Sequence, residues 1–310
     1  MNDSMVKDIR YIKLHFRVRF PEDSILPVNK VSALRGGMGE MLLRANCIRD
    51  RNCTSCDFES ECIVRRTMYS KMEIQPAFMN VNDSIGYVLE CEDYHDTFAA
   101  GEDLSFQLIL FGKTIVYFNQ FLLAFYALGQ SGIGKHRARF EIISVSNSKK
   151  EEIIEGANVY MGNYKVGTVD DYVRYRLRQI GRKEPGTYTV RFQSPLALKY
   201  DHEMIRDFRA DAVFAGIQRR IYMLDCFEGI ESSPRLPEDF PIPDTVRSFA
   251  REIRVKRHSN RTDTSMTFEG IEGEMELKNV SEEALKLLLA GELIHIGKNT
   301  SFGFGRYRVK

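Results

Sequence analysis

Hydrophobic and polar residues alternate over two separate stretches of the chain, IRYIKLHFRVRF at 9–20 and GTYTVRFQSPLALK at 186–199. This period of two is typical of a β-strand with one buried face. A helical pattern follows each stretch, VNKVSALRGGMGEMLLRAN in the first half and HEMIRDFRADAVFAGIQRRIYML in the second. Strand-rich sequence comes next (DLSFQLILFG and SMTFEGIEGEMEL), and then a second Leu-rich helix. Each half is therefore predicted to run strand–helix–strand–strand–helix–strand.

The two halves also share a short motif after the second predicted helix. Ile-Gly-Lys occurs at 133–135 and again at 296–298, each time before a cationic segment and a strand with Phe or Tyr. The repeated order predicts an α+β protein of two tandem ferredoxin-like (RRM-like, βαββαβ) domains. We place the N-terminal domain at 1–148, a joining segment at 149–185 and the C-terminal domain at 186–310.

Composition agrees with a globular protein, since 43% of the 310 residues are hydrophobic and 28% are charged. The N-terminus has no pattern of a secretion signal. The longest apolar run, TIVYFNQFLLAFYAL, is interrupted by Asn119 and Gln120 and suits a buried helix better than a membrane span. We therefore expect a cytoplasmic protein that does not enter a membrane.

Charge is informative through its distribution, because the net charge is only +1. Basic strips lie at 134–139 and 251–261, and the chain ends in HIGKNTSFGFGRYRVK. Such strips on a neutral protein can follow a phosphate backbone, although each alone is equally typical of a solvated surface strand. In the last stretch, glycines would let the backbone approach a phosphate while cations supply charge. The residues predicted to bind RNA are Arg35, Lys135, Arg137, Arg139, Arg257, Arg261, Gly297, Lys298, Gly303, Gly305 and Arg306.

Four of the six cysteines fall within sixteen residues, as Cys47, Cys53, Cys56 and Cys62 in the spacing C-x5-C-x2-C-x5-C. In a cytoplasmic protein this clustering favours metal binding over disulfides. A structural zinc ion with four thiolate ligands is the preferred interpretation. An iron–sulfur cluster and four free thiols remain the alternatives. With four cysteines as ligands, zinc would have no open position for catalysis.

Several motifs together resemble the CRISPR-associated endoribonucleases of the RAMP superfamily, which process precursor repeat RNA into guide RNAs for antiviral defense. These motifs are LRGGMGEML (34–42), the four-cysteine insertion, LGQSGIGKHRARFEI (128–142), FQSPLALK (192–199), RHSNR (257–261) and the terminal IHIGKNTSFGFGRYRV (294–309). The resemblance implies two ferredoxin-like domains and RNA cleavage without a metal. It also implies attack by the nucleotide's 2′-hydroxyl, which leaves a 2′,3′-cyclic phosphate and a 5′-hydroxyl. CRISPR repeat RNA is the implied partner, and a CRISPR effector complex would receive the product.

This chemistry needs a proton acceptor, a proton donor and cations around the phosphate. Our candidates for catalysis are His15, His258, His295 and Lys298. Some relatives carry a histidine on the first helix near the position of Glu40, so the chain departs from the family pattern there. Two other interpretations follow: a non-catalytic RNA-binding subunit of the same fold, and a metal-cluster nucleic-acid repair protein suggested by the cysteines alone.

Overall fold

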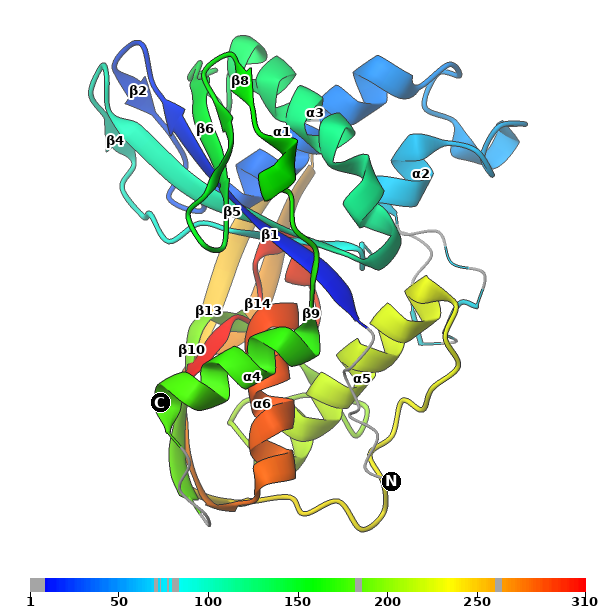
Figure 1. The fold of residues 1–310 in the computed structure, drawn as a ribbon, viewed down its shortest axis with the longest axis vertical. Helices are drawn as coiled ribbons and strands as arrows, with labels where there is room; N and C mark the ends of the chain where they lie inside the picture. Colours follow the sequence, from blue (N-terminus) through cyan, green and yellow to red (C-terminus); the bar gives the residue numbers. More distant parts are fainter. Residues whose placement is uncertain are drawn as a thin grey trace. The chain divides into compact units, whose positions relative to one another are not determined.

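The computed structural model describes residues 9–69, 72, 74–76, 78, 79, 84–181, 186–259 and 264–310. They form two compact domains (Figure 1). The N-terminal domain comprises Tyr11–Val166, and the C-terminal domain comprises Gly167–Lys310 with Ile9 and Arg10. No helix within the described ranges is both long and apolar enough to span a membrane.

The N-terminal domain is built on an antiparallel sheet in which β3, β5, β1, β6, β7 and β8 are neighbours in that order. Alternate residues of β1, from Ile12 to Val18, are buried beneath the helices, where the rings of Phe16, Phe106 and Phe125 pack together. The elements are β1 (Arg10–Arg19), β2 (Ser24–Ile25), α1 (Lys30–Asn46), η1 (Cys53–Ser55), α2 (Ile63–Met68), β3 (Tyr87–Glu90), β4 (Thr97–Phe98), β5 (Asp103–Phe111), η2 (Gly112–Tyr117), α3 (Phe118–Ser131), β6 (Glu141–Asn147), β7 (Glu152–Glu155), β8 (Asn158–Val159) and η3 (Met161–Asn163).

The C-terminal domain has a four-stranded antiparallel sheet in the order β13-β14-β10-β15. Its core contains the stacked rings of Phe192 and Phe208, whose centroids are 4.7 Å apart, with Tyr307 packed against Phe192. The elements are β9 (Gly167–Thr168), α4 (Val169–Ile180), β10 (Gly186–Leu196), β11 (Lys199–Tyr200), β12 (Glu203–Met204), α5 (Ala210–Glu228), β13 (Asp244–Ser259), β14 (Thr264–Val280), α6 (Glu282–Ile294), η4 (Thr300–Phe302) and β15 (Tyr307–Val309).

Both domains have the ferredoxin-like arrangement, which confirms the predicted fold class. Counting only the main strands of each βαββαβ unit, the sheet order is 4-1-3-2 in the N-terminal domain (β6, β1, β5, β3) and in the C-terminal domain (β15, β10, β14, β13). The first strand is central in each domain and is hydrogen-bonded on both edges. In both strands alternate residues are buried, and this burial of one face explains the alternating pattern in the two stretches of sequence.

The repeated Ile-Gly-Lys triplet has the same structure in the two domains. Each triplet follows the second helix, α3 or α6, and consists of a buried isoleucine, a glycine with positive φ and an exposed lysine. The φ angles of Gly134 and Gly297 are 73° and 81°. The repeated motif therefore marks the same turn of a duplicated fold.

The segment 149–185, predicted to join the domains, is largely structured. Its first part forms β7, β8 and η3 of the N-terminal domain, while β9 and α4 belong to the C-terminal domain. A capping box starts α4, because the Thr168 hydroxyl accepts from the Asp171 amide and the Asp171 carboxylate accepts from the Thr168 amide. Residues 182–185 lie outside the described residues.

Candidate nucleic-acid interface

The glycine-rich loop, defined here as Ile296–Gly305, connects α6 to β15 in the C-terminal domain. Gly297, Asn299, Gly303 and Gly305 all have positive φ, between 62° and 81°. A Cβ on Gly305 would lie 1.8 Å from the Ile296 carbonyl oxygen, and one on Gly297 would lie 2.5 Å from the Ala197 carbonyl oxygen. The glycines thus allow two backbone segments of the protein to approach each other, a use different from the predicted approach to phosphate.

The backbone amides of this loop point largely into the protein. Lys298 N donates to Ala197 O at 2.7 Å and Gly305 N donates to Pro195 O at 2.9 Å. The amides of Phe302, Gly303 and Phe304 donate to carbonyls within the loop itself. In this conformation these five amides are engaged within the protein and do not bind an anion. The Lys298 side chain is exposed and can contact phosphate.

His295, one of the candidates for catalysis, lies in the interior of the C-terminal domain. Its side chain is 0% exposed, and Nδ1 lies 3.0 Å from the Phe304 carbonyl oxygen. The residue ends α6 with a φ of 57°, which turns the chain back over the imidazole. Arg220 of α5 lies nearby, and its Nε donates to Ile294 O at 3.1 Å. These contacts give His295 a structural role in fixing the start of the loop.

Arg306 is also buried, with 8% of its surface exposed. Its amide donates to Ser194 Oγ at 2.9 Å, and its carbonyl accepts from the Gln193 and Ser194 amides. Its backbone is therefore fixed against β10, and its predicted contact with RNA stays a prediction.

A long hairpin packs against the glycine-rich loop. Beyond the Leu196–Ile271 pair, β13 and β14 continue as a two-stranded ribbon (Figure 1). Val255 and Phe268 on this ribbon contact Phe302 and Phe304 of the loop, and the Phe268–Phe302 ring centroids are 5.2 Å apart. The loop and the hairpin therefore form one surface of the C-terminal domain.

Charge on the hairpin is balanced near its base and basic near its tip. The basic strip on β13 lies opposite the acidic stretch of β14, with Arg251–Glu272 at 3.5 Å and Arg254–Glu269 at 3.1 Å. Nearer the tip, Lys256, Arg257 and His258 lie opposite Thr267, Met266 and Ser265, which carry no charge. The Lys256 side chain is exposed. Arg261, predicted to bind RNA, lies outside the described residues.

The equivalent turn of the N-terminal domain carries the other predicted basic strip. Ile133 and Ala138 exchange two backbone hydrogen bonds of 2.9 and 3.0 Å, which close the turn. The side chains of Lys135, Arg137 and Arg139 are exposed. Their predicted contact with RNA stays a prediction.

His15 lies on β1 between Gln107 of β5 and Ser146 of β6, on the sheet face opposite the Phe16 core. The side chain is half-buried. Burial has the largest effect and lowers the pKa of His15 below its ordinary value of 6.5. Lys13 lowers this pKa further, Glu90 raises it by less than Lys13 lowers it, and Lys150 lowers it slightly. The imidazole is therefore neutral near pH 7, as a proton acceptor must be.

Glu40, at the position where some relatives carry a histidine, is held by two arginines. Arg51 donates to both carboxylate oxygens, at 2.7 and 3.0 Å, and Arg44 Nε donates at 2.9 Å. Burial alone would raise the pKa of Glu40, but these hydrogen bonds outweigh it and the pKa is lowered. The carboxylate charge is thus compensated locally, which weakens the repulsion of phosphate that its sequence position suggests.

Arg35 on α1 is directed toward the segment before β3. Its Nη2 donates to Ser84 Oγ at 3.2 Å, and the side chain is half-buried. The contact ties α1 to the start of the second strand. This contact therefore supports a structural role for Arg35.

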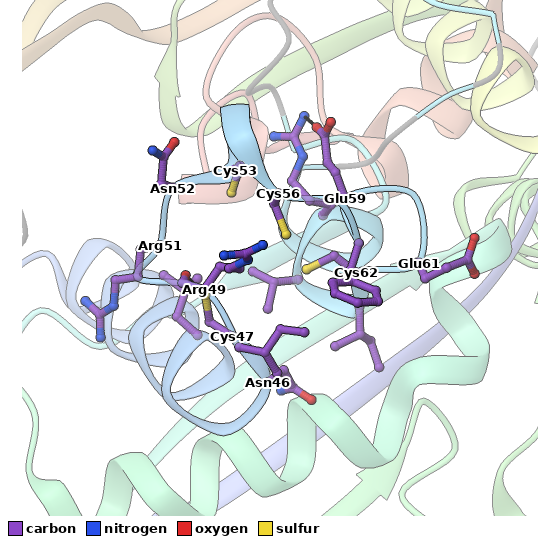
Figure 2. A pocket seen from close by; sticks show the side chains of 16 residues that line it. Asn46, Cys47, Arg49, Arg51, Asn52, Cys53, Cys56, Glu59, Glu61 and Cys62 are labelled. Atoms are coloured by element: carbon purple, nitrogen blue, oxygen red, sulfur yellow. Dashed lines mark hydrogen bonds and ion pairs between the residues drawn. The ribbon is translucent and has the colours of Figure 1, made fainter.

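The four clustered cysteines line one pocket between the end of α1 and the start of α2 (Figure 2). Cys56 N donates to Cys53 O at 3.3 Å, so the x2 spacing forms the short turn expected for a chelating pair. Among the described residues, however, no three potential ligands lie close enough to coordinate one metal ion. As placed here, the thiols do not form a finished metal site.

Family comparisons connect these features with known proteins. The model named CRISPR_Cas6, described as CRISPR-associated endoribonuclease Cas6, matches residues 190–307, from β10 through the glycine-rich loop. The AF_1859_N model, described as an N-terminal domain, matches residues 9–171, which is more than half of the chain. The chain belongs to the AF_1859_N family, and its C-terminal domain is similar to Cas6. An uncharacterized protein of Archaeoglobus fulgidus is 22% identical over 97% of this chain and 98% of its own length.

Solved Cas6 structures share the fold. A Thermus thermophilus Cas6, TTHB231, in a product complex has a TM-score of 0.52 at 13% identity and covers 97% of this chain and 100% of its own. A chain of a partial Cas6-RT-Cas1–Cas2 complex has a TM-score of 0.58 at 11% identity and covers 99% of this chain. The present chain spans only 47% of that larger one. At these identities the similarity establishes the tandem ferredoxin-like fold.

Two lysines near the candidate site residues were missed in the sequence. Lys256 was not singled out within the basic strip. The residue opposite it on β14 is uncharged, so Lys256 has no acidic residue directly across the hairpin. Lys13 shares the sheet face of His15 and lowers its pKa. The period of two along β1 was the available signal, since it places Lys13, His15 and Arg17 on one face.

Proposed function

We propose that this chain is an endoribonuclease that cleaves CRISPR repeat RNA without a metal ion and releases guide RNAs. In the proposed reaction a base removes the proton of a 2′-hydroxyl, and that oxygen attacks the adjacent phosphorus. The bond from phosphorus to the 5′-oxygen breaks, and the leaving oxygen takes up a proton. The products are a 2′,3′-cyclic phosphate and a 5′-hydroxyl, and the guide RNA then passes to a CRISPR effector complex.

The observation that carries the proposal is the match of residues 190–307 to the Cas6 endoribonuclease model. This range contains the glycine-rich loop and the β13–β14 hairpin that packs against it. Lys298 is exposed on the loop, and Lys256 is exposed near the hairpin tip. Two cations on neighbouring elements suit an RNA backbone, which binds through its phosphates.

For proton transfer, His15 is the histidine whose described environment suits a base. It is half-buried and neutral, and it lies beside Lys13, which can stabilise nearby negative charge. His258 stays a candidate by its position near the hairpin tip. Lys298 is proposed to stabilise charge on phosphate rather than to transfer a proton.

The second candidate function is a non-catalytic RNA-binding subunit of a CRISPR effector complex. The burial of His295 favours it, because one of the three histidines proposed for catalysis is engaged in holding the fold. Glu40 occupies the position at which some relatives carry a helix histidine, and its carboxylate is bound by arginines. This difference also favours a non-catalytic subunit. Both functions need the basic surfaces, but only the first needs a base.

A cleavage assay separates the two. We would incubate the purified chain with 5′-labelled repeat RNA in excess chelator and expect one cut. The upstream product should carry a cyclic phosphate, and the downstream product should accept phosphate from a polynucleotide kinase without prior dephosphorylation. A single 2′-deoxy substitution at the cut nucleotide should abolish cleavage and preserve binding. RNA that is bound and remains intact would support the non-catalytic subunit instead.

Variants then assign the base. His15→Gln keeps a polar side chain that cannot accept the proton, and we expect it to slow cleavage by about 100-fold or more. His202→Asn is the matched control, because His202 is exposed and has a φ of 68°, which asparagine tolerates. A rate for His15→Gln equal to that of the control would remove His15 from the mechanism and leave His258→Gln as the next test.

A further inference from the structure

The residues between the first two helices of the N-terminal domain lack an apolar core of their own. We call residues 48–61 the cysteine excursion. Among its described side chains, only Cys53, Cys56 and Glu59 are not exposed. Its two large apolar side chains face solvent, with Ile48 71% exposed and Phe58 53% exposed. Hydrophobic burial therefore contributes little to holding this segment in one conformation.

Ion pairs form within the cysteine excursion and between the excursion and the helices. Arg49 binds Asp57 at 2.9 Å, and Arg51 binds Glu40 of α1. Such exposed pairs contribute little free energy, while ordering fourteen residues has a large entropic cost. Small segments without a core are commonly stabilised by a disulfide or a metal ion. Two of the three described side chains here that are not exposed are cysteines.

The four thiols are placed so that one ion would connect the excursion to its base. Cys47 directly follows α1 and Cys62 directly precedes α2, so two ligands are fixed by helix ends. Cys53 and Cys56 come from the excursion, and the four line the same pocket (Figure 2). A metal held by both pairs would close the fourteen-residue loop at its base.

We propose that Cys47, Cys53, Cys56 and Cys62 bind one zinc ion as thiolates and that binding orders the cysteine excursion. Four thiols lose four protons to solvent when Zn²⁺ binds, and the product is a tetrahedral tetrathiolate complex. The thiols do not all meet in this structure, so binding brings the Cys53–Cys56 turn toward the helix ends. The site is structural and independent of RNA cleavage, because four cysteines leave no open coordination position.

Metal analysis of the full-length chain tests the proposal. We expect about one zinc ion per chain after dialysis, and Cys53→Ser and Cys56→Ser should each reduce this to below about 0.1. Cys226→Ser is the matched control, since Cys226 is buried in α5 of the other domain. Replacing zinc with cobalt should give the intense visible absorption of a tetrahedral thiolate complex.

A second measurement does not depend on the variants folding. Trypsin should cleave wild-type protein at Arg49 or Arg51 at least about tenfold faster after zinc is removed by a chelator, and added zinc should restore protection. The proposal is overturned by metal-free folded protein that takes up no zinc. It is also overturned by iron and inorganic sulfide in place of zinc, or by cleavage rates that do not change with metal.

Discussion

Arg176 of α4 and Glu292 of α6 form a buried, two-point ion pair in the C-terminal domain. Nε donates to one carboxylate oxygen at 2.8 Å and Nη2 donates to the other at 3.2 Å. Glu292 also accepts from the Tyr172 hydroxyl at 2.8 Å and from the Val309 amide at 2.6 Å. Burial alone would lower the pKa of Arg176, but Glu292 outweighs this effect and raises it. One carboxylate therefore joins α4, α6 and β15.

We predict that Glu292→Gln destabilises the C-terminal domain by about 3–5 kcal/mol, because it leaves the Arg176 charge buried without its counter-ion. The matched control is Arg254→Ala, which breaks an exposed pair with Glu269 and should cost less than about 1 kcal/mol. Urea unfolding of the full-length chain measures both. Equal effects of the two variants would show that the buried network contributes no more than a surface pair.

The environment of His15 leads to a prediction about pH. Because its pKa is lowered in the folded protein, the unfolded chain takes up the proton first as the pH falls below 6.5. His15 thus has no effect on the free energy of unfolding well above pH 6.5 and reduces it as the pH falls through 6.5 toward the folded pKa. We expect His15→Gln to remove that loss and to be more stable than wild type near pH 5.

Lys13→Met should raise the pKa of His15 toward its ordinary value. The substitution removes a cation that disfavours the imidazolium, and it also removes the hydrogen bond of 2.8 Å that Lys13 donates to the Glu90 carboxylate. NMR titration of the imidazole C–H resonances measures the change. Lys165→Met is the control, because it removes an exposed lysine that is paired with Glu151. It should leave the pKa of His15 unchanged. A His15 pKa that does not move in Lys13→Met would contradict the electrostatic argument.

Salt dependence should identify the lysines that contact phosphate. For Lys298→Ala and Lys256→Ala we predict weaker RNA binding and a slope of log affinity against log salt that is reduced by about one in each case. Lys286→Ala is the control, since Lys286 is exposed on α6 and paired with Glu282 at 2.7 Å. Filter binding at several salt concentrations measures the slopes. If all three variants behave alike, the loop and the hairpin tip are not the RNA-binding surface.

Gly305→Ala should destabilise the C-terminal domain by at least about 2 kcal/mol, because its φ is 72° and the new Cβ would overlap the Ile296 carbonyl oxygen. Gly162→Ala is the control, since a Cβ there meets no atom within 4 Å. Thermal unfolding of both variants measures the difference. A Gly305→Ala protein as stable as the control would mean that the loop can rearrange to accept a side chain.

Much of the fold was predictable because it depends on local periodicity. The alternation along β1 and β10 and the two helical patterns in each half follow from which face of each element is buried. The structured part of 149–185 was missed, although Thr168 and Asp171 have the spacing of a capping box before α4. A short amphipathic helix beside glycines and charges is easily taken for a connection.

The site was less predictable because it depends on register and burial. The basic and acidic stretches of β13 and β14 were each visible in the sequence, but only their pairing shows that most of the charge cancels. His295 and Arg306 looked exposed because they lie among glycines and cations. The tight return of the chain from Ile296 to Gly305, which covers the His295 imidazole, has no signature in periodicity.

The close contacts of Gly297 and Gly305 affect how genomes can be searched for related proteins. Both glycines are required by carbonyl oxygens of the chain itself, so natural selection for folding alone would preserve them. A descendant that had lost nuclease activity altogether would still keep the motif. Its presence in a new sequence is therefore evidence of shared ancestry and architecture, and activity has to be inferred from other positions.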